Sequence, residues 1–143
     1  MPDKPETKTP SPLVARRQLS FLGTFEKKFE GFRRELERLE RVAGNESRSG
    51  AWPTEGLERI ARSLVGAGAV YSLPSITDWA RAFLARVDEI RGAATPPSRD
   101  DLGWLAEQIG ALTELADRAR ATANDVIEPG APRAPDRRTS SDP

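Results

Sequence analysis

The 143-residue sequence contains no cysteine and no histidine. The lack of cysteine excludes disulfide bonds, thiolate nucleophiles and cysteine-bound metals together. The lack of histidine removes the usual ligand of zinc, haem and most transition metals, and it removes the commonest general base near neutral pH. We therefore expect a protein that is not an enzyme and that holds no cofactor and no metal.

An excess of charge is also lacking, since 22 Lys and Arg residues balance 22 Asp and Glu residues. A balanced chain gives no general argument for binding nucleic acid, a membrane surface or a strongly charged substrate. No apolar run approaches the length of about 18 residues that a membrane span needs, and the first residues lack the apolar region of a signal peptide. We expect a cytoplasmic protein with no membrane span and no nucleic-acid partner.

Proline divides the chain into three parts. Residues 1–12 hold prolines among charged and hydroxyl residues, and residues 128–143 combine prolines with arginines. Such segments bury too little apolar surface to offset the entropy lost on ordering. The sequence predicts disordered tails at 1–12 and 128–143, with one helical domain over residues 13–127.

Four amphipathic helices are predicted within this domain. The first extends from Phe21 to Val42, because its apolar residues recur in steps of three and four. These residues are Phe21, Phe25, Phe29, Phe32, Leu36, Leu39 and Ala43. We interpret the phenylalanines as core residues and not as an aromatic ligand box. A short helix from Pro12 to about Leu19 precedes this helix, either separate from it or continuous with it.

The other three helices follow turn residues. Thr54 is predicted to be the N-cap of a helix that covers residues 57–71. Two capping boxes, Ser75 with Asp78 and Ser98 with Asp101, are predicted to begin the third and fourth helices. Amphipathic helices joined by loops of roughly four to eleven residues favour an all-α fold, an antiparallel up-down four-helix bundle. The short N-terminal helix would be an addition to this bundle.

Residues 57–71 carry the candidate site. Their apolar residues form one stripe around the helix, which we expect to face the core. The stripe consists of Leu57, Ile60, Leu64, Ala67 and Tyr71. Arg62 lies opposite the stripe, and Gly68 is expected to help another protein to approach closely. The predicted partner-binding residues are Arg59, Arg62, Val65, Gly66 and Ala69.

The order Arg62-Ser63-Leu64-Val65-Gly66, followed by small residues and by Leu73-Pro74, resembles the histidine-phosphotransfer (HPt) family. Members of that family are four-helix bundles that relay phosphoryl groups between receiver domains, and their motif is of the type His-x-Leu-Lys-Gly. The leucine, the glycine and the loop length agree with the motif. The phosphorylated histidine falls on Arg62 and the lysine falls on Val65.

This difference at Arg62 changes the chemistry. A guanidinium group has five donors and no acceptor lone pair, so Arg62 cannot take a phosphoryl group as histidine does. The resemblance therefore implies a degenerate, phosphotransfer-incompetent HPt-like protein. Its implied partner is a response-regulator receiver domain or a histidine kinase, and its implied role is to modulate a two-component phosphorelay. The oligomeric state stays open.

Other interpretations stay open beside the resemblance. Arg62 is equally well explained as an ordinary solvated arginine on a helix surface. The whole chain also fits a structural or assembly adaptor that binds its partner through the Trp104 side or the tails, with no receiver involved. An enzyme is disfavoured, because a nucleophile such as Ser63 would need an activating base, and no histidine is present to supply one.

Overall fold

The structure, a computed structural model, describes residues 9–44 and 52–129. Within these ranges the regular structure is entirely helical, which confirms the all-α fold. The five helices are α1 (Pro12–Leu22), α2 (Phe25–Ala43), α3 (Glu55–Val70), α4 (Pro74–Gly92) and α5 (Arg99–Ile127). Most of the two predicted tails lies outside the described residues, so their predicted disorder stays a prediction.

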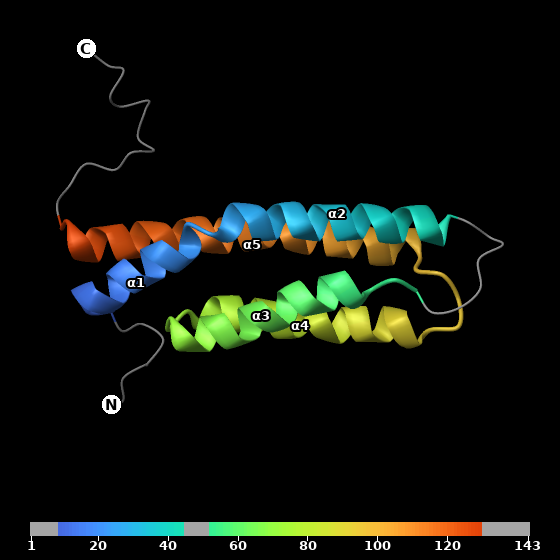
Figure 1. Cartoon of the computed structure of the whole chain (residues 1–143), viewed down its shortest axis with the longest axis horizontal. Helices are drawn as coiled ribbons and strands as arrows, with labels where there is room; N and C mark the ends of the chain where they lie inside the picture. Colours follow the sequence, from blue (N-terminus) through green and yellow to red (C-terminus); the bar gives the residue numbers. More distant parts are fainter. Residues whose placement is uncertain (1–8, 45–51, 130–143) are drawn as a thin grey trace, which may run out of the picture.

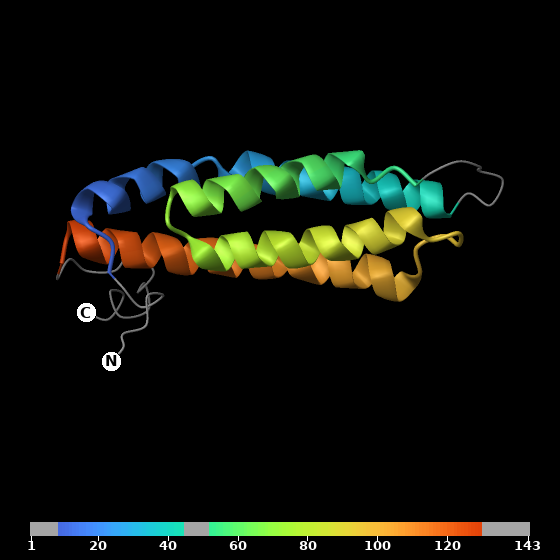
Figure 2. The same ribbon diagram turned by 90° about the horizontal axis from the view of Figure 1, so that it is seen from below.

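The four long helices α2 to α5 extend along the long axis of the molecule (Figure 1). Helix α3 packs against α2 and α4, and helix α5 packs against the same two helices, so the four helices enclose one core. Helix α1 packs against α5 near one end of the bundle (Figure 2). The fold is therefore a helical bundle with a short additional N-terminal helix.

Aromatic side chains fill the middle of the core. The Phe32 ring packs edge-on against Phe83 and Trp79, at centroid distances of 5.2 and 5.6 Å. The Trp79 indole N–H donates a 2.8 Å hydrogen bond to the carbonyl of Gln108, which satisfies its buried polar group. Trp52 is buried ahead of α3 and belongs to the same core. The phenylalanine stripe is thus a packing feature, as predicted.

The prediction of one helix from Phe21 to Val42 is wrong, because the chain breaks at Gly23 and Thr24. The hydroxyl of Thr24 donates a 2.7 Å hydrogen bond to the Phe21 carbonyl. In addition, the Arg120 guanidinium of α5 donates a 3.0 Å bond to the Leu22 carbonyl. Both bonds satisfy carbonyl groups that a helix end leaves open. A contact from a distant helix thus stabilises a break that the apolar periodicity does not reveal.

Of the two predicted capping boxes, one is present. Ser98 precedes α5, its hydroxyl accepts a 3.0 Å bond from the Asp101 N–H, and the Asp101 carboxylate accepts a 3.1 Å bond from the Ser98 N–H. The prediction of a capping box at Ser75 and Asp78 is wrong, because α4 already begins at Pro74. Proline is favoured at the first helical position, since it lacks the N–H that would stay unpaired there.

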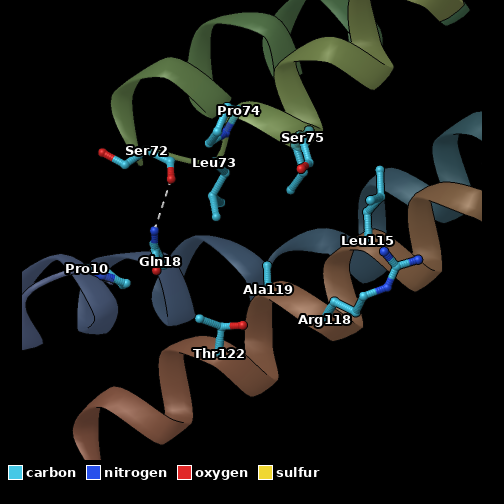
Figure 3. Close-up of a pocket in the computed structure, with 11 residues that line it drawn as sticks. Pro10, Gln18, Ser72, Leu73, Pro74, Ser75, Leu115, Arg118, Ala119 and Thr122 are labelled. Carbon is cyan, nitrogen blue, oxygen red and sulfur yellow. Dashed lines mark hydrogen bonds between the residues drawn. The ribbon is translucent and has the colours of Figure 1, made fainter. Parts of the chain in front are cut away.

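A tight turn joins α3 to α4. Ser72 adopts a positive φ of 58°, a conformation that side chains with a Cβ rarely adopt. From α1, the Gln18 amide donates a 2.9 Å bond to the carbonyl of Tyr71. It also donates a 3.3 Å bond to the carbonyl of Ser72 (Figure 3). Helix α1 therefore fixes the turn at the end of α3, next to the candidate site.

Candidate functional site

The predicted partner-binding residues lie along the outward face of α3. Arg59, Arg62, Gly66 and Ala69 are exposed, and their spacing of three and four residues places them on one side of the helix. Val65 differs from them because it is half-buried and packs against the core. We call the four exposed residues the α3 ridge, and Val65 lies at its inner edge.

The two glycines of α3 have different roles. A Cβ atom added at Gly66 would meet nothing within 4 Å, so the ridge is open at this position. A Cβ added at Gly68 would lie 2.1 Å from the Thr77 hydroxyl and 2.9 Å from the Thr77 nitrogen. Gly68 is buried and lets α4 approach α3, so the expectation that it helps another protein to approach closely is wrong. Of the two glycines, Gly66 is the one that lies on the exposed face of α3.

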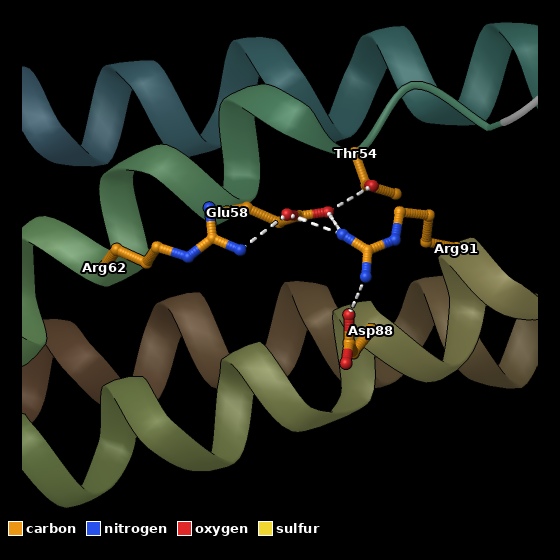
Figure 4. A network of polar contacts seen from close by, with 5 residues as sticks. All are labelled: Thr54, Glu58, Arg62, Asp88 and Arg91. Carbon is orange, nitrogen blue, oxygen red and sulfur yellow. Dashed lines mark hydrogen bonds and ion pairs between the residues drawn. The ribbon is translucent and has the colours of Figure 1, made fainter.

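Behind the ridge lies a charged cluster centred on Glu58 (Figure 4). Glu58 is 5% exposed. Its carboxylate accepts two hydrogen bonds from Arg91 at 2.9 and 2.8 Å, one from the Thr54 hydroxyl at 2.8 Å and one from Arg62 at 3.1 Å. Arg91 also pairs with Asp88 on its own helix. The cluster thus joins the first turns of α3 to the last turns of α4.

The pKa of Glu58 is lowered from its ordinary value. Burial acts against the charged carboxylate, but the hydrogen bond from Thr54 and the positive charges of Arg91 and Arg62 outweigh it. Glu58 is therefore ionised at neutral pH. A buried carboxylate that stays charged and fully hydrogen-bonded serves to position its arginines, and it has no proton to exchange near neutrality.

Glu58 was not among the residues predicted from the sequence. Part of the signal was available, because Thr54, Glu58 and Arg62 follow one another at i,i+4 spacing on one helix face. Arg91 lies 33 residues from Glu58, so no local pattern links the two. Thr54 does precede α3 as predicted, but its hydroxyl bonds Glu58 and makes no side-chain cap.

A groove of about 290 Å³ runs between α3 and α4, directly beside the ridge. Its lining combines two arginines, two acids and two small or apolar residues: Glu58, Arg62, Arg81, Leu84, Ala85 and Asp88. Arg62 is therefore shared between the ridge and the groove. The groove extends the candidate site from α3 onto α4.

A second hollow, of about 250 Å³, lies between α1, the α3–α4 turn and α5 (Figure 3). The Gln18 amide in it is already bonded to the turn, and Arg118 is paired with Glu114 at 3.9 Å. The residues that line this hollow include hydroxyl groups, but none of them is a base that could activate a hydroxyl as a nucleophile. We therefore place the candidate site on the α3–α4 side.

Trp104, the alternative binding residue, is half-buried. Its ring stacks on Phe83 with centroids 6.3 Å apart, and the Arg86 guanidinium lies 5.1 Å from the ring centroid. Arg86 is itself paired with Asp101 at 3.3 Å. Trp104 thus covers neighbouring side chains, as an off-stripe tryptophan on a core-facing helix usually does. It offers less free surface than the α3 ridge.

Two negative findings apply to residues 9–44 and 52–129. No group of three or more acidic side chains lies close enough together to hold a metal ion. No helix combines the length and the apolar character that a membrane crossing requires.

No family model, curated protein or solved structure matches the chain.

Proposed function

We propose that the chain is an HPt-like protein that binds a response-regulator receiver domain, or its kinase, through the α3 ridge and transfers no phosphoryl group. In this proposal the four long helices alternate in direction, as in an antiparallel up-down bundle. The observation that carries the proposal is the open surface at Gly66 beside exposed Arg62. A partner backbone or helix approaches closely where no Cβ projects, and a guanidinium next to it binds a carboxylate with two parallel hydrogen bonds.

Arg62 is available for such a contact at little expense to the fold. Its side chain is 64% exposed, and a single 3.1 Å hydrogen bond holds it to Glu58. If Arg62 turns toward a partner, Glu58 still keeps its bonds to Arg91 and Thr54. Because the Arg62 side chain lies mostly in solvent, its ion pair with Glu58 contributes only about 0.2–1 kcal/mol to the free energy of unfolding. Release of Arg62 therefore leaves the buried carboxylate satisfied.

The output of this binding is inhibition, sequestration or scaffolding. Arg62 occupies the position where the HPt motif has its phosphorylated histidine, and the chain has no histidine elsewhere. A receiver domain bound at the ridge is occupied without receiving or losing a phosphoryl group. The protein would then compete with a phosphotransfer-competent partner for the same receiver surface.

The test is to measure binding of purified receiver domains to the wild-type protein and to Arg62→Glu. Arg118→Glu is the matched control, because Arg118 also pairs with a glutamate at i,i+4 spacing but lies on α5. The proposal predicts that Arg62→Glu weakens binding by about tenfold or more, as expected for a like charge placed against an acidic partner. Arg118→Glu should leave binding unchanged.

A second candidate is an adaptor that binds an apolar partner surface with no receiver involved. The observation in its favour is Val70 at the end of α3, whose side chain is large, apolar and 75% exposed. Removal of residues 1–8 and 130–143 separates receiver binding from adaptor binding through the tails. Receiver binding should survive this change, whereas adaptor binding through the tails should not.

A further inference from the structure

Arg81 is an exposed arginine of α4 that lines the same groove as Arg62. Among the described residues no carboxylate lies within ion-pair distance of its guanidinium. Asp78 lies one turn earlier on the same helix, yet it makes no ion pair with Arg81 in this part of the chain. Arg81 therefore presents a free positive charge at the groove.

The groove is lined by two guanidinium groups, from Arg62 and Arg81, and by the two carboxylates of Glu58 and Asp88. Arg91 bonds both carboxylates, and Arg62 adds a further bond to Glu58. Of the charged groups that line the groove, the Arg81 guanidinium is the one that makes no ion pair within the described chain. An unpaired guanidinium at a groove attracts an anionic side chain from a partner.

The remaining lining of the groove fits the same kind of side chain. Leu84 is half-buried and Ala85 is exposed, so both offer apolar surface within the groove. An aspartate or glutamate would place its methylene groups on this surface and its carboxylate at the two arginines. Glu58 is not available to a partner lysine, because Arg91, Arg62 and Thr54 already bond its carboxylate.

We propose that Arg81 is a second anchoring residue of the docking surface, and that the α3–α4 groove receives a surface carboxylate of the receiver domain between Arg62 and Arg81. This inference rests on the proposed function, because it uses the same partner. It adds α4 to the interface, and it adds a chemical requirement, an acidic side chain at the rim of the receiver surface that meets the α3 ridge.

The experiment compares wild-type protein, Arg81→Glu, Arg81→Gln and the α5 control Arg118→Glu for binding to a panel of purified receiver domains. Thermal unfolding of each variant checks the fold, which these exposed substitutions should leave intact. The inference predicts that Arg81→Glu weakens binding by about tenfold and Arg81→Gln by about threefold. Arg81→Gln should also reduce the dependence of affinity on salt, because one screened charge contact is lost.

The outcomes separate this inference from the proposed function. If a receiver binds the wild-type protein and Arg81→Glu binds equally well, the groove is not part of the interface and the inference is wrong, while the α3 ridge proposal stands. If no receiver in the panel binds the wild-type protein, the proposed function is overturned and the inference with it. Equal losses for Arg81→Glu and Arg118→Glu would indicate a general charge effect, and they would also overturn the inference.

Discussion

Glu58 and Arg91 join α3 to α4 through two hydrogen bonds of 2.9 and 2.8 Å, although 33 residues separate them in the chain. The Glu58 side chain is 6% exposed and the Arg91 side chain is 43% exposed, so the pair spans from the interior to the surface. The two helices that it connects carry the α3 ridge and the groove. The pair thus sets the relative position of the two walls of the candidate site.

The first prediction concerns the stability that this cluster provides. Glu58→Ala should lower the free energy of unfolding by about 1–3 kcal/mol, because the buried Thr54 hydroxyl loses its acceptor and Arg91 loses its main partner. Arg62→Ala should change it by less than about 1 kcal/mol, since Arg62 is mostly exposed. Urea denaturation monitored by circular dichroism measures both variants. Equal losses would show that Arg62 is a structural residue and is not free to bind a partner.

The second prediction concerns pH. Folding lowers the pKa of Glu58, so the folded state favours the ionised carboxylate. The resulting stability is fully present above the unfolded pKa, and it is lost as the pH falls through the folded pKa. The stability difference between the wild-type protein and Glu58→Gln should therefore be largest near neutral pH and shrink as the pH falls through the folded pKa of Glu58.

Asp101 contributes in the same direction, since its hydrogen bond from the Ser98 backbone lowers its pKa. Glu58→Gln should accordingly keep part of the acid sensitivity of the wild-type protein. Unfolding free energies measured across the pH range test this. A wild-type advantage over Glu58→Gln that is the same in acid as at neutral pH would contradict the assignment of a charged Glu58.

The third prediction compares the two glycines of α3. Gly66→Ala should raise the free energy of unfolding by about 0.5–1 kcal/mol, because alanine favours the helix and its Cβ meets no atom within 4 Å. Gly68→Ala should lower it by about 1–3 kcal/mol, because its Cβ would overlap the Thr77 side chain and backbone. Thermal or urea unfolding measures both. The opposite order would contradict the orientation of α3.

Gly66→Ala has a further consequence for binding. If a receiver domain approaches closely at Gly66, the added methyl group should weaken binding even though the protein is more stable. A variant that gains stability and keeps full affinity would show that the partner does not contact this part of the ridge.

The local signals in the sequence predicted much of the fold. The Ser98 and Asp101 capping box and the apolar stripe of α2 are local patterns, and the structure confirms them. The break at Gly23 escaped prediction because the contact that stabilises it comes from Arg120, far away in the chain. The capping box at Ser75 failed because the proline just before it begins the helix.

The candidate site was predicted less completely than the fold. The outward face of α3 follows from helical periodicity, so Arg59, Arg62 and Gly66 were placed correctly on the surface. The groove was not predicted, because its walls come from two helices whose register depends on tertiary packing. Arg81 and Glu58 look alike in the sequence, as charged residues within amphipathic helices. Only the packing shows that Glu58 is buried and paired, and that Arg81 makes no ion pair within the described chain.

The fourth prediction concerns the turn between α3 and α4. Ser72→Gly should raise the free energy of unfolding by up to about 1 kcal/mol, because glycine adopts a positive φ without the Cβ clash. Ser72→Val should lower it, because a β-branched residue is strained in this region. Gln18→Ala should lower it by about 1–2 kcal/mol through the loss of the bonds to the turn carbonyls. Thermal unfolding measures these variants. A higher stability of Ser72→Val than of Ser72→Gly would contradict the turn geometry.

The central claim, that the α3 ridge binds a receiver domain, is tested most directly by titrating a panel of purified receiver domains against the wild-type protein and Arg62→Glu. Each titration is carried out with and without beryllofluoride, a mimic of the acyl phosphate, and isothermal calorimetry gives the affinity. The account predicts that at least one receiver binds the wild-type protein and that Arg62→Glu loses about tenfold or more of that affinity. Absence of binding by every receiver, or an affinity that Arg62→Glu leaves unchanged, would contradict it.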